Sequence, residues 1–281
     1  MSKTRPRASR AIEPNMGYSL AAGKRIQKIV NAFEIAYKKE ALKIAAKYCK
    51  NEVQDAAISV VPSELEIALA ALAAKQSMGM GSNAKQVSRW YCRQLLRNIS
   101  ADQKRALKKA GISTAWLKQK WTVQIVRGQY VAPSVAAKIP EQVEANAALI
   151  TKLCERSAQK VQNAIAEGIS KGYNLSRLTE KINSLENMDE ARAARVALDQ
   201  SCKLNQFIQV ENSKALGVKE GIWVHVPGQY ESRASHMKMN GKKFDLEKGM
   251  YDPDVEDYVQ PGELPYCRCC FKAILPGFLL D

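Results

Sequence analysis

The sequence lacks the features that would place the chain in a membrane or send it out of a cell. No apolar run approaches the roughly 18 unbroken residues that a membrane helix requires. The N-terminus is basic but has no apolar signal-peptide core. The seven cysteines are odd in number and dispersed, which indicates reduced thiols rather than a disulfide framework. We therefore expect a protein made in a cytoplasm, with no membrane partner.

Residues for catalysis are also scarce. Neither standard phosphate-binding glycine loop occurs in the sequence. The two histidines are followed by Val226-Pro227 and Met237-Lys238, so the His-x-Glu of a zinc deaminase is missing. A cysteine nucleophile paired with His236 is formally available, but nothing else in the sequence supports it. An enzyme is therefore the weaker class, and we assign no catalytic residue.

Acidic residues are rare in two segments, and the net charge of +15 is concentrated there. Residues 1–50 hold twelve Lys/Arg against three acids, and residues 84–128 hold eleven against one, so the remainder carries −4. Such asymmetry favours DNA, another polyanion or an acidic protein as partner, although lysine-rich helices often serve only solubility. The candidate contact residues are Arg5, Arg7, Arg10, Lys24, Lys28, Arg89, Arg93 and Arg97.

The apolar spacing predicts a mainly α protein that ends in a small α+β module with short β-hairpins. A basic flexible arm (1–15) is expected before a basic helical N-terminal domain (16–135). Residues 78–83 should interrupt the second helix, and residues 128–140 should link the two halves. The C-terminal domain (136–281) should contain helices over 142–217 and a β-containing module over 218–275.

Both histidines and three cysteines fall between residues 222 and 270, where strand signals also appear. A β-branched and aromatic run closes at Pro227, and Asn240-Gly241 is typical of a two-residue hairpin turn. The distinctive pieces are Arg-Ala-Ser-His (233–236), Asn-Gly-Lys-Lys-Phe (240–244), Pro-Gly-Glu (261–263) and Cys-Arg-Cys (267–269). Trp223 and a preceding helical block, Asp-Gln-Ser-Cys-Lys-Leu-Asn (199–205), complete the set.

In this order, over roughly residues 145–272, these pieces resemble the phage Mu F-like minor head proteins, the head-morphogenesis family of tailed phages. The resemblance implies a structural minor head protein, acting near the portal and located in the head interior or at the portal vertex. It also implies portal, major capsid or scaffold protein as partners. The motif residues are Asp199, Gln200, Lys203, Asn205, Trp223, Arg233, Ser235, His236, Gly241, Phe244, Pro261, Gly262, Glu263, Cys267, Arg268 and Cys269. The alternatives are a nucleic-acid-binding protein outside the virion, or a metal-dependent hydrolase or toxin domain on the same module.

A structural zinc ion is a further expectation for this module, which has few large apolar residues for its length. On a strand, Cys267 and Cys269 would share one face, and His236 could approach from the opposite side. These are ligand types that zinc prefers, with His225, a carboxylate such as Glu263, or water as the fourth. The alternative is a packing role, with His236 hydrogen-bonded to backbone.

Overall fold

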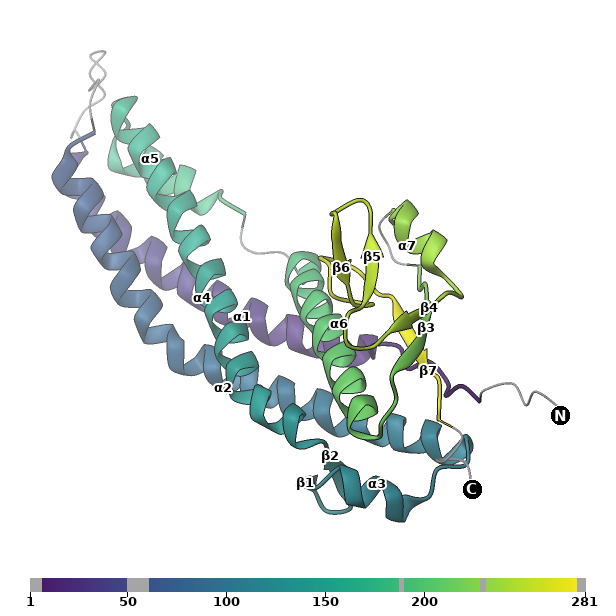
Figure 1. Cartoon of the computed structure of the whole chain (residues 1–281). Helices are drawn as coiled ribbons and strands as arrows, with labels where there is room; N and C mark the ends of the chain where they lie inside the picture. The colour runs from purple at the N-terminus through teal and green to yellow at the C-terminus, as the bar shows by residue number, and fades with distance from the viewer. Residues whose placement is uncertain (1–6, 50–60, 187–189, 228–230, 277–281) are drawn as a thin grey trace, which may run out of the picture. The chain divides into compact units, whose positions relative to one another are not determined.

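The computed structural model describes residues 7–49, 61–186, 190–227 and 231–276. Within these ranges the fold is mainly α with a small C-terminal β-containing module, as predicted (Figure 1). The helices are α1 (Met16–Ala45), α2 (Ser63–Lys109), α3 (Thr114–Lys120), α4 (Pro133–Ser170), α5 (Leu175–Asn183), α6 (Glu190–Ala215) and α7 (Ala234–Met239), with a 3-10 turn at Ala46–Tyr48. The strands are β1 (Val123–Val126), β2 (Gln129–Val131), β3 (Glu220–Val224), β4 (Lys243–Asp245), β5 (Met250–Asp252), β6 (Asp257–Val259) and β7 (Cys270–Ala273).

The chain divides into two compact units that alternate along the sequence. Unit 1 comprises Met1–Ala21, Trp90–Gln142 and Arg195–Asp281, and unit 2 comprises Ala22–Arg89 and Val143–Ala194. The domain bounds predicted from the sequence, 16–135 and 136–281, stay a prediction. No helix among the described residues is both long and apolar enough to cross a membrane.

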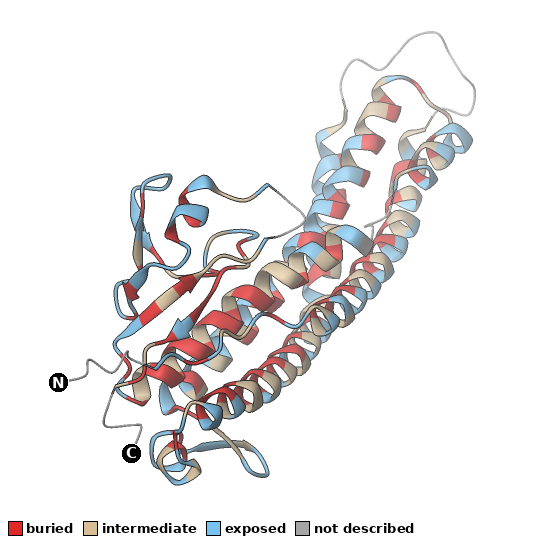
Figure 2. Cartoon of the chain, turned by 90° about the vertical axis from the view of Figure 1, so that its right-hand side faces the viewer, coloured by how far each residue is buried: buried red, intermediate tan, exposed pale blue. Residues whose placement is uncertain are grey.

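Unit 2 is helical, and the expected amphipathic pattern holds it together. The predicted apolar stripe of α1 is buried at Val30, Phe33 and Tyr37, and the rings of Phe33 and Tyr37 stack at 5.8 Å. The Tyr37 hydroxyl donates to the carbonyl oxygen of Leu69 on α2 at 2.9 Å. Buried residues follow one side of the long helices and exposed residues the other (Figure 2). The apolar stripes of these amphipathic helices therefore face the interior of the unit.

Helix α2 runs through a predicted break. The expected interruption over residues 78–83 is wrong, because α2 is continuous for 47 residues. Each glycine in a helix costs about 1 kcal/mol relative to alanine, which neighbouring packing outweighs. Ser77, Ala84 and Ser88, on either side of the glycines, are buried.

The predicted linker over residues 128–140 is also wrong beyond Ala132. Strands β1 and β2 form a short antiparallel pair, after which α4 begins at Pro133 and continues past Pro140. Proline suits the first position of a helix because the N–H that it lacks has no helical partner there. Helix α4 therefore absorbs the second half of the segment that looked like a linker.

Residues 7–14 are held in place rather than forming the flexible arm expected from composition. Ala8 bridges Ile274, and the Ser9 N–H donates to the carbonyl oxygen of Ala273 at 2.9 Å. The backbone thus extends the edge next to β7, which gives its polar groups partners that an unattached arm would lack. Residues 1–6, including Arg5, lie outside the described residues.

Three small sheets supply the β structure. Strands β4, β3 and β7 form an antiparallel sheet in that order, with Gly221 paired to Phe244 on one side and Ala273 on the other. Strands β5 and β6 pair antiparallel in a separate ribbon. These strands belong to the C-terminal module, residues 218–276, which packs beside α6 within unit 1 (Figure 1).

Candidate functional site

Helix α6 is buried between residues 201 and 213 at all but three positions, although many of its side chains are polar. Asn205 and Gln209 both donate to the carbonyl oxygen of Ile12, at 3.2 and 2.9 Å, and fix the N-terminal segment. Buried polar groups need such partners because leaving one unsatisfied costs about 1–3 kcal/mol. The family-like block over residues 199–205 therefore lies on a helix that organises its surroundings.

Asn212 makes the same kind of connection further along α6. Its side-chain oxygen accepts from the Ala132 N–H at 2.8 Å, and its amide donates to Gln103 at 2.9 Å. The indole of Trp121 donates to the Asn212 carbonyl oxygen at 3.0 Å, and Trp121 is buried. Trp121 therefore belongs to the core of unit 1.

The C-terminal module contacts α6 through two loops, one between β4 and β5 and one between β6 and β7. The Tyr266 N–H donates to Asp199 at 2.8 Å, and Lys214 forms an ion pair with Glu247 at 2.7 Å. A Cβ atom added at Gly262 would lie 3.3 Å from the Cys202 carbonyl oxygen on α6, so the loop approaches the helix closely. Two family-like motifs, 199–205 and 261–263, thus meet at one packing surface.

A small aromatic core lies between the module's sheet and α7. Trp223 is fully buried and makes edge contacts with the rings of His236 at 5.3 Å and Phe244 at 5.7 Å. Phe244 in turn contacts Phe271 at 5.9 Å. Gly221 is required here, because a Cβ atom would come within 2.9 Å of both phenylalanine rings. The sequence motifs around residues 223, 236 and 244 therefore share one core.

The predicted hairpin at Asn240-Gly241 is wrong, and the reason bears on His236. Residues 234–239 form helix α7, so the turn connects a helix to β4 rather than two strands. Gly241 has φ +78°, the left-handed conformation that favours glycine just after a helix end. Helix α7 carries His236 into the module, where the ring is only 2% exposed.

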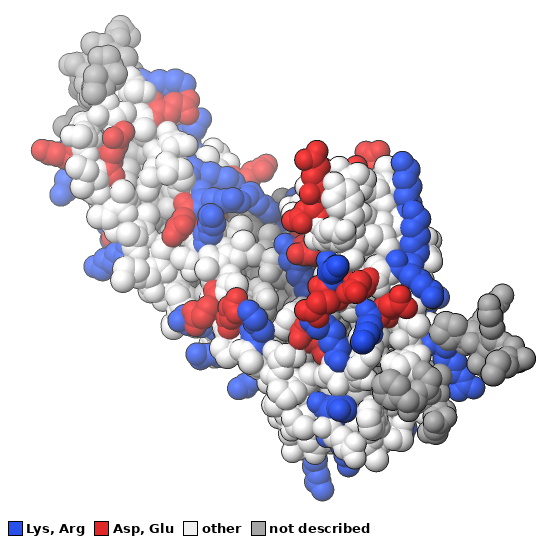
Figure 3. All heavy atoms as spheres, in the orientation of Figure 1, with Lys and Arg blue, Asp and Glu red and all other residues white. Residues whose placement is uncertain are grey.

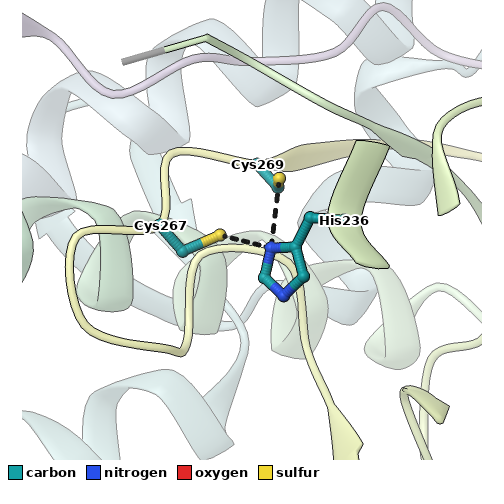
Figure 4. A group of neighbouring side chains, drawn as sticks. All are labelled: His236, Cys267 and Cys269. Atoms are coloured by element: carbon teal, nitrogen blue, oxygen red, sulfur yellow. Dashed lines mark hydrogen bonds between the residues drawn. The ribbon is translucent and has the colours of Figure 1, made fainter. Parts of the chain in front are cut away.

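His236, Cys267 and Cys269 are brought together, as the sequence predicted. Their ligand atoms all lie within 4.8 Å of one another, and all three residues are buried. The Nδ1 atom of His236 lies 3.3 Å from Cys267 Sγ and 3.7 Å from Cys269 Sγ (Figure 4). The cysteines precede β7 instead of lying on a strand, because a turn with Tyr266 at φ +62° turns the backbone. We call these three residues and His225 the Cys-His cluster.

Two further residues complete the surroundings of the Cys-His cluster. His225, just after β3, places its Nδ1 atom 3.5 Å from Cys269 Sγ. Asp252, on β5, is fully buried, and its Oδ2 lies 3.0 Å from Nε2 of His236. Sequence reasoning missed Asp252, because its only local signal is an Asp-Pro turn and it is sixteen positions from His236.

The electrostatics of the cluster favour one thiolate near neutral pH. The hydrogen bond from Cys267 is the largest influence on Cys269 and lowers its pKa to about 7, while donating that bond, together with burial, raises the pKa of Cys267. Burial lowers the pKa of His236, but Cys267 and the Asp252 carboxylate outweigh it and raise the pKa overall. Burial and the neighbouring His236 lower the pKa of His225.

Asp252 is also set to remain charged. Burial raises its pKa, yet the Asp254 N–H and the His236 ring outweigh burial and hold the pKa below its ordinary value. An ionised Asp252 accepts from His236 Nε2, which places Nδ1 of the ring toward the two sulfurs. The arrangement can hold a metal ion, and it has the order of groups of a Cys-His-Asp nucleophile system.

Burial weighs against the nucleophile interpretation. Cys267 and Cys269 are 5% and 3% exposed, and a nucleophile must reach a substrate. The zinc-deaminase pattern stays excluded by sequence. Packing alone is a third role for the cluster, but the expected hydrogen bond from His236 to backbone gives way to the one with Asp252.

The remaining motif residues make turns and contacts rather than a second cluster. Arg233 donates to the Pro265 carbonyl oxygen at 3.1 Å and Arg268 to that of Pro227 at 3.2 Å. Glu263 accepts from the Gln260 N–H at 2.7 Å, so its carboxylate stabilises a turn. Ser235 and Pro261 are buried, Lys203 pairs with Asp199 at 3.0 Å, and Gln200 donates to Asp199 at 3.1 Å.

The predicted basic contact residues are exposed wherever the structure describes them. Arg89, Arg93 and Arg97 follow one another at intervals of four on α2, so they share one face of that helix. Arg7, Arg10, Lys24 and Lys28 are also exposed, and Arg5 lies outside the described residues. On the face that Figure 3 shows, basic and acidic side chains are interspersed rather than forming one basic field.

Comparison with known proteins agrees with the motifs. Residues 159–272 match the family model described as "Phage Mu protein F like protein". A Haemophilus influenzae protein described as uncharacterized is 28% identical over 138 residues, which cover 49% of this chain and 30% of that protein. The chain therefore spans less than a third of the length of that curated relative. No solved structure matches the chain.

The family match covers α6, the Cys-His cluster and every motif from residue 199 onward. This confirms the resemblance stated from the motif order. The family indicates a phage head-morphogenesis protein and a place in the virion. Residues 159–272 of the chain are thus similar to the phage Mu protein F-like family.

Proposed function

We propose that this chain is a structural minor head protein of a tailed phage, incorporated in few copies near the portal. The observation that carries the proposal is the meeting of the family-like motifs at one packing surface, where the 261–263 turn lies against α6. Residues that a catalytic site would expose are buried here, which supports a non-enzymatic role. Portal, major capsid or scaffold protein are the partners that such a role requires.

Deletion of the gene in its phage tests this proposal. We expect defective heads or uninfectious particles, and restoration by the full chain supplied in trans. The same tagged chain should co-purify with procapsids and portal protein. Normal infectious virions without the chain, together with free protein acting on nucleic acid in the cell, would instead support a nucleic-acid-binding role outside the virion.

We further propose that the basic segments contact packaged DNA inside the head. The exposed Arg89, Arg93 and Arg97 supply a row of charges with the spacing of successive helical turns. A protein that neutralises phosphates loses affinity as salt rises, with a slope of about −0.9 per contact on a log–log plot. The full chain should therefore bind duplex DNA without sequence preference and with a steep salt dependence.

A charge-matched pair of variants tests the DNA contact. Changing Arg89, Arg93 and Arg97 together to Gln should reduce the salt slope by about 2–3. The control changes three exposed lysines outside the basic segments, Lys152, Lys160 and Lys219, to Gln and leaves the slope nearly unchanged. An equal decrease of the salt slope in both variants would show that net charge alone, and not these three arginines, governs binding. Salt-insensitive binding would leave an acidic protein as the partner.

A further inference from the structure

The donor atoms of His236, Cys267 and Cys269 lie within 4.8 Å of one another, close enough for one ion, and His225 approaches Cys269 beside them. Zinc–sulfur and zinc–nitrogen bonds of about 2.3 and 2.05 Å at tetrahedral angles separate S from N by about 3.6 Å. His236 Nδ1 lies 3.3 and 3.7 Å from the sulfurs of Cys267 and Cys269, and His225 Nδ1 lies 3.5 Å from the sulfur of Cys269. We propose that His225, His236, Cys267 and Cys269 bind one zinc ion.

The chemistry of the donors points to zinc rather than to a harder cation. Two thiolates and two imidazoles in a tetrahedral arrangement suit zinc, whereas magnesium and calcium select oxygen ligands. Both histidines turn Nδ1 toward the sulfurs, so each imidazole offers one ring nitrogen. Of the fourth ligands left open by the sequence, Glu263 is engaged in its own turn, whereas His225 has its Nδ1 atom 3.5 Å from Cys269 Sγ.

Asp252 supplies the outer contact that metal-binding histidines usually have. Its carboxylate accepts from Nε2 of His236 at 3.0 Å, which orients the ring and directs the Nδ1 lone pair to the cluster. Asp252 is 0% exposed, and its Oδ2 atom forms a hydrogen bond with the imidazole of His236. A buried carboxylate in this position is explained by a histidine held as a ligand.

The ion would join three segments of a module with a small core. His225 follows β3, His236 lies on α7, and the cysteines form the loop before β7. The contacting residues are far apart in the sequence: 31 positions separate His236 from Cys267, and 44 separate His225 from Cys269. Binding therefore closes long loops, and its free energy adds to the stability of the folded module. The role is structural, because four protein ligands leave no position for a substrate.

Metal analysis of the full chain, purified without a histidine tag and with zinc supplied, tests the proposal. We expect about one zinc per chain in the wild type and almost none in the Cys267→Ser/Cys269→Ser double variant. Cys270→Ser is the matched control, because Cys270 is equally buried and adjacent but lies outside the clustered ligand atoms. That variant should retain the zinc.

Two further measurements keep the test decisive if the double variant fails to fold. X-ray absorption of the wild type should show two sulfur and two nitrogen neighbours. In competition with a chelator, His225→Ala should lose zinc affinity at least tenfold and Asp252→Asn about 10–100-fold, while Glu263→Ala stays unchanged. Folded wild type with almost no zinc, a different metal, or a shell without sulfur would overturn the proposal. Rapid alkylation of a metal-free Cys269 would instead support the Cys-His nucleophile.

Discussion

Substitution of Gly262 by alanine probes the surface on which the module meets α6. Gly262 has φ +79°, where a side chain costs about 1–2 kcal/mol of backbone strain. The new Cβ atom would also lie 3.2 Å from the Cys269 carbonyl oxygen and 3.3 Å from that of Cys202. Both atoms belong to backbone, so the loop must move, and overpacking of this kind costs about 1–3 kcal/mol. We expect Gly262→Ala to lower the free energy of unfolding by about 2–5 kcal/mol.

Gly241→Ala is the matched control within the same module. Gly241 has nearly the same backbone angle, φ +78°, but nothing lies within 4 Å of its added Cβ. This variant should be destabilised only by the backbone strain, about 1–2 kcal/mol. Urea denaturation followed by tryptophan fluorescence measures both variants. If Gly262→Ala costs no more than Gly241→Ala, the 261–263 turn does not pack against α6 as described.

Three other substitutions have definite expected effects. Gly79→Ala should stabilise the protein by about 0.5–1 kcal/mol in thermal melts, because Gly79 lies within α2 and nothing is near its added Cβ; destabilisation would show that α2 is interrupted there. Asn212→Ala should cost about 3 kcal/mol in urea denaturation because it leaves the buried Ala132 N–H without its acceptor, and a loss under 1 kcal/mol would contradict that contact. Phe244→Ala should cost about 3–5 kcal/mol and change the fluorescence of Trp223, whose ring it contacts; an unchanged spectrum would refute the shared core.

The sequence predicted the helices best where packing and local signals agree. Helix α1 follows its apolar stripe, and Asn174 caps α5 by accepting from the Arg177 N–H. The predictions failed where tertiary packing outweighed a local preference. Helix α2 passes through Gly79 and Gly81, since each costs only about 1 kcal/mol.

The sequence indicated which three side chains would come together, but not the elements that bring them together. His236, Cys267 and Cys269 stand out because such residues are rare in this sequence and fall in one stretch. Their approach depends on the α7 helix and on the turn at Tyr266, neither of which the strand pattern indicated. Asp252 contacts His236 only after the chain folds back, so periodicity holds no information about it.

The most direct test of the proposed function is the composition of the phage particle itself. Quantitative mass spectrometry of purified virions and procapsids should detect this chain in a fixed low ratio to portal protein. The ratio should be the same in virions of independent preparations, because assembly sets it. Absence of the chain from both particles, with abundant free chain in the infected cell, would contradict a structural role in the head.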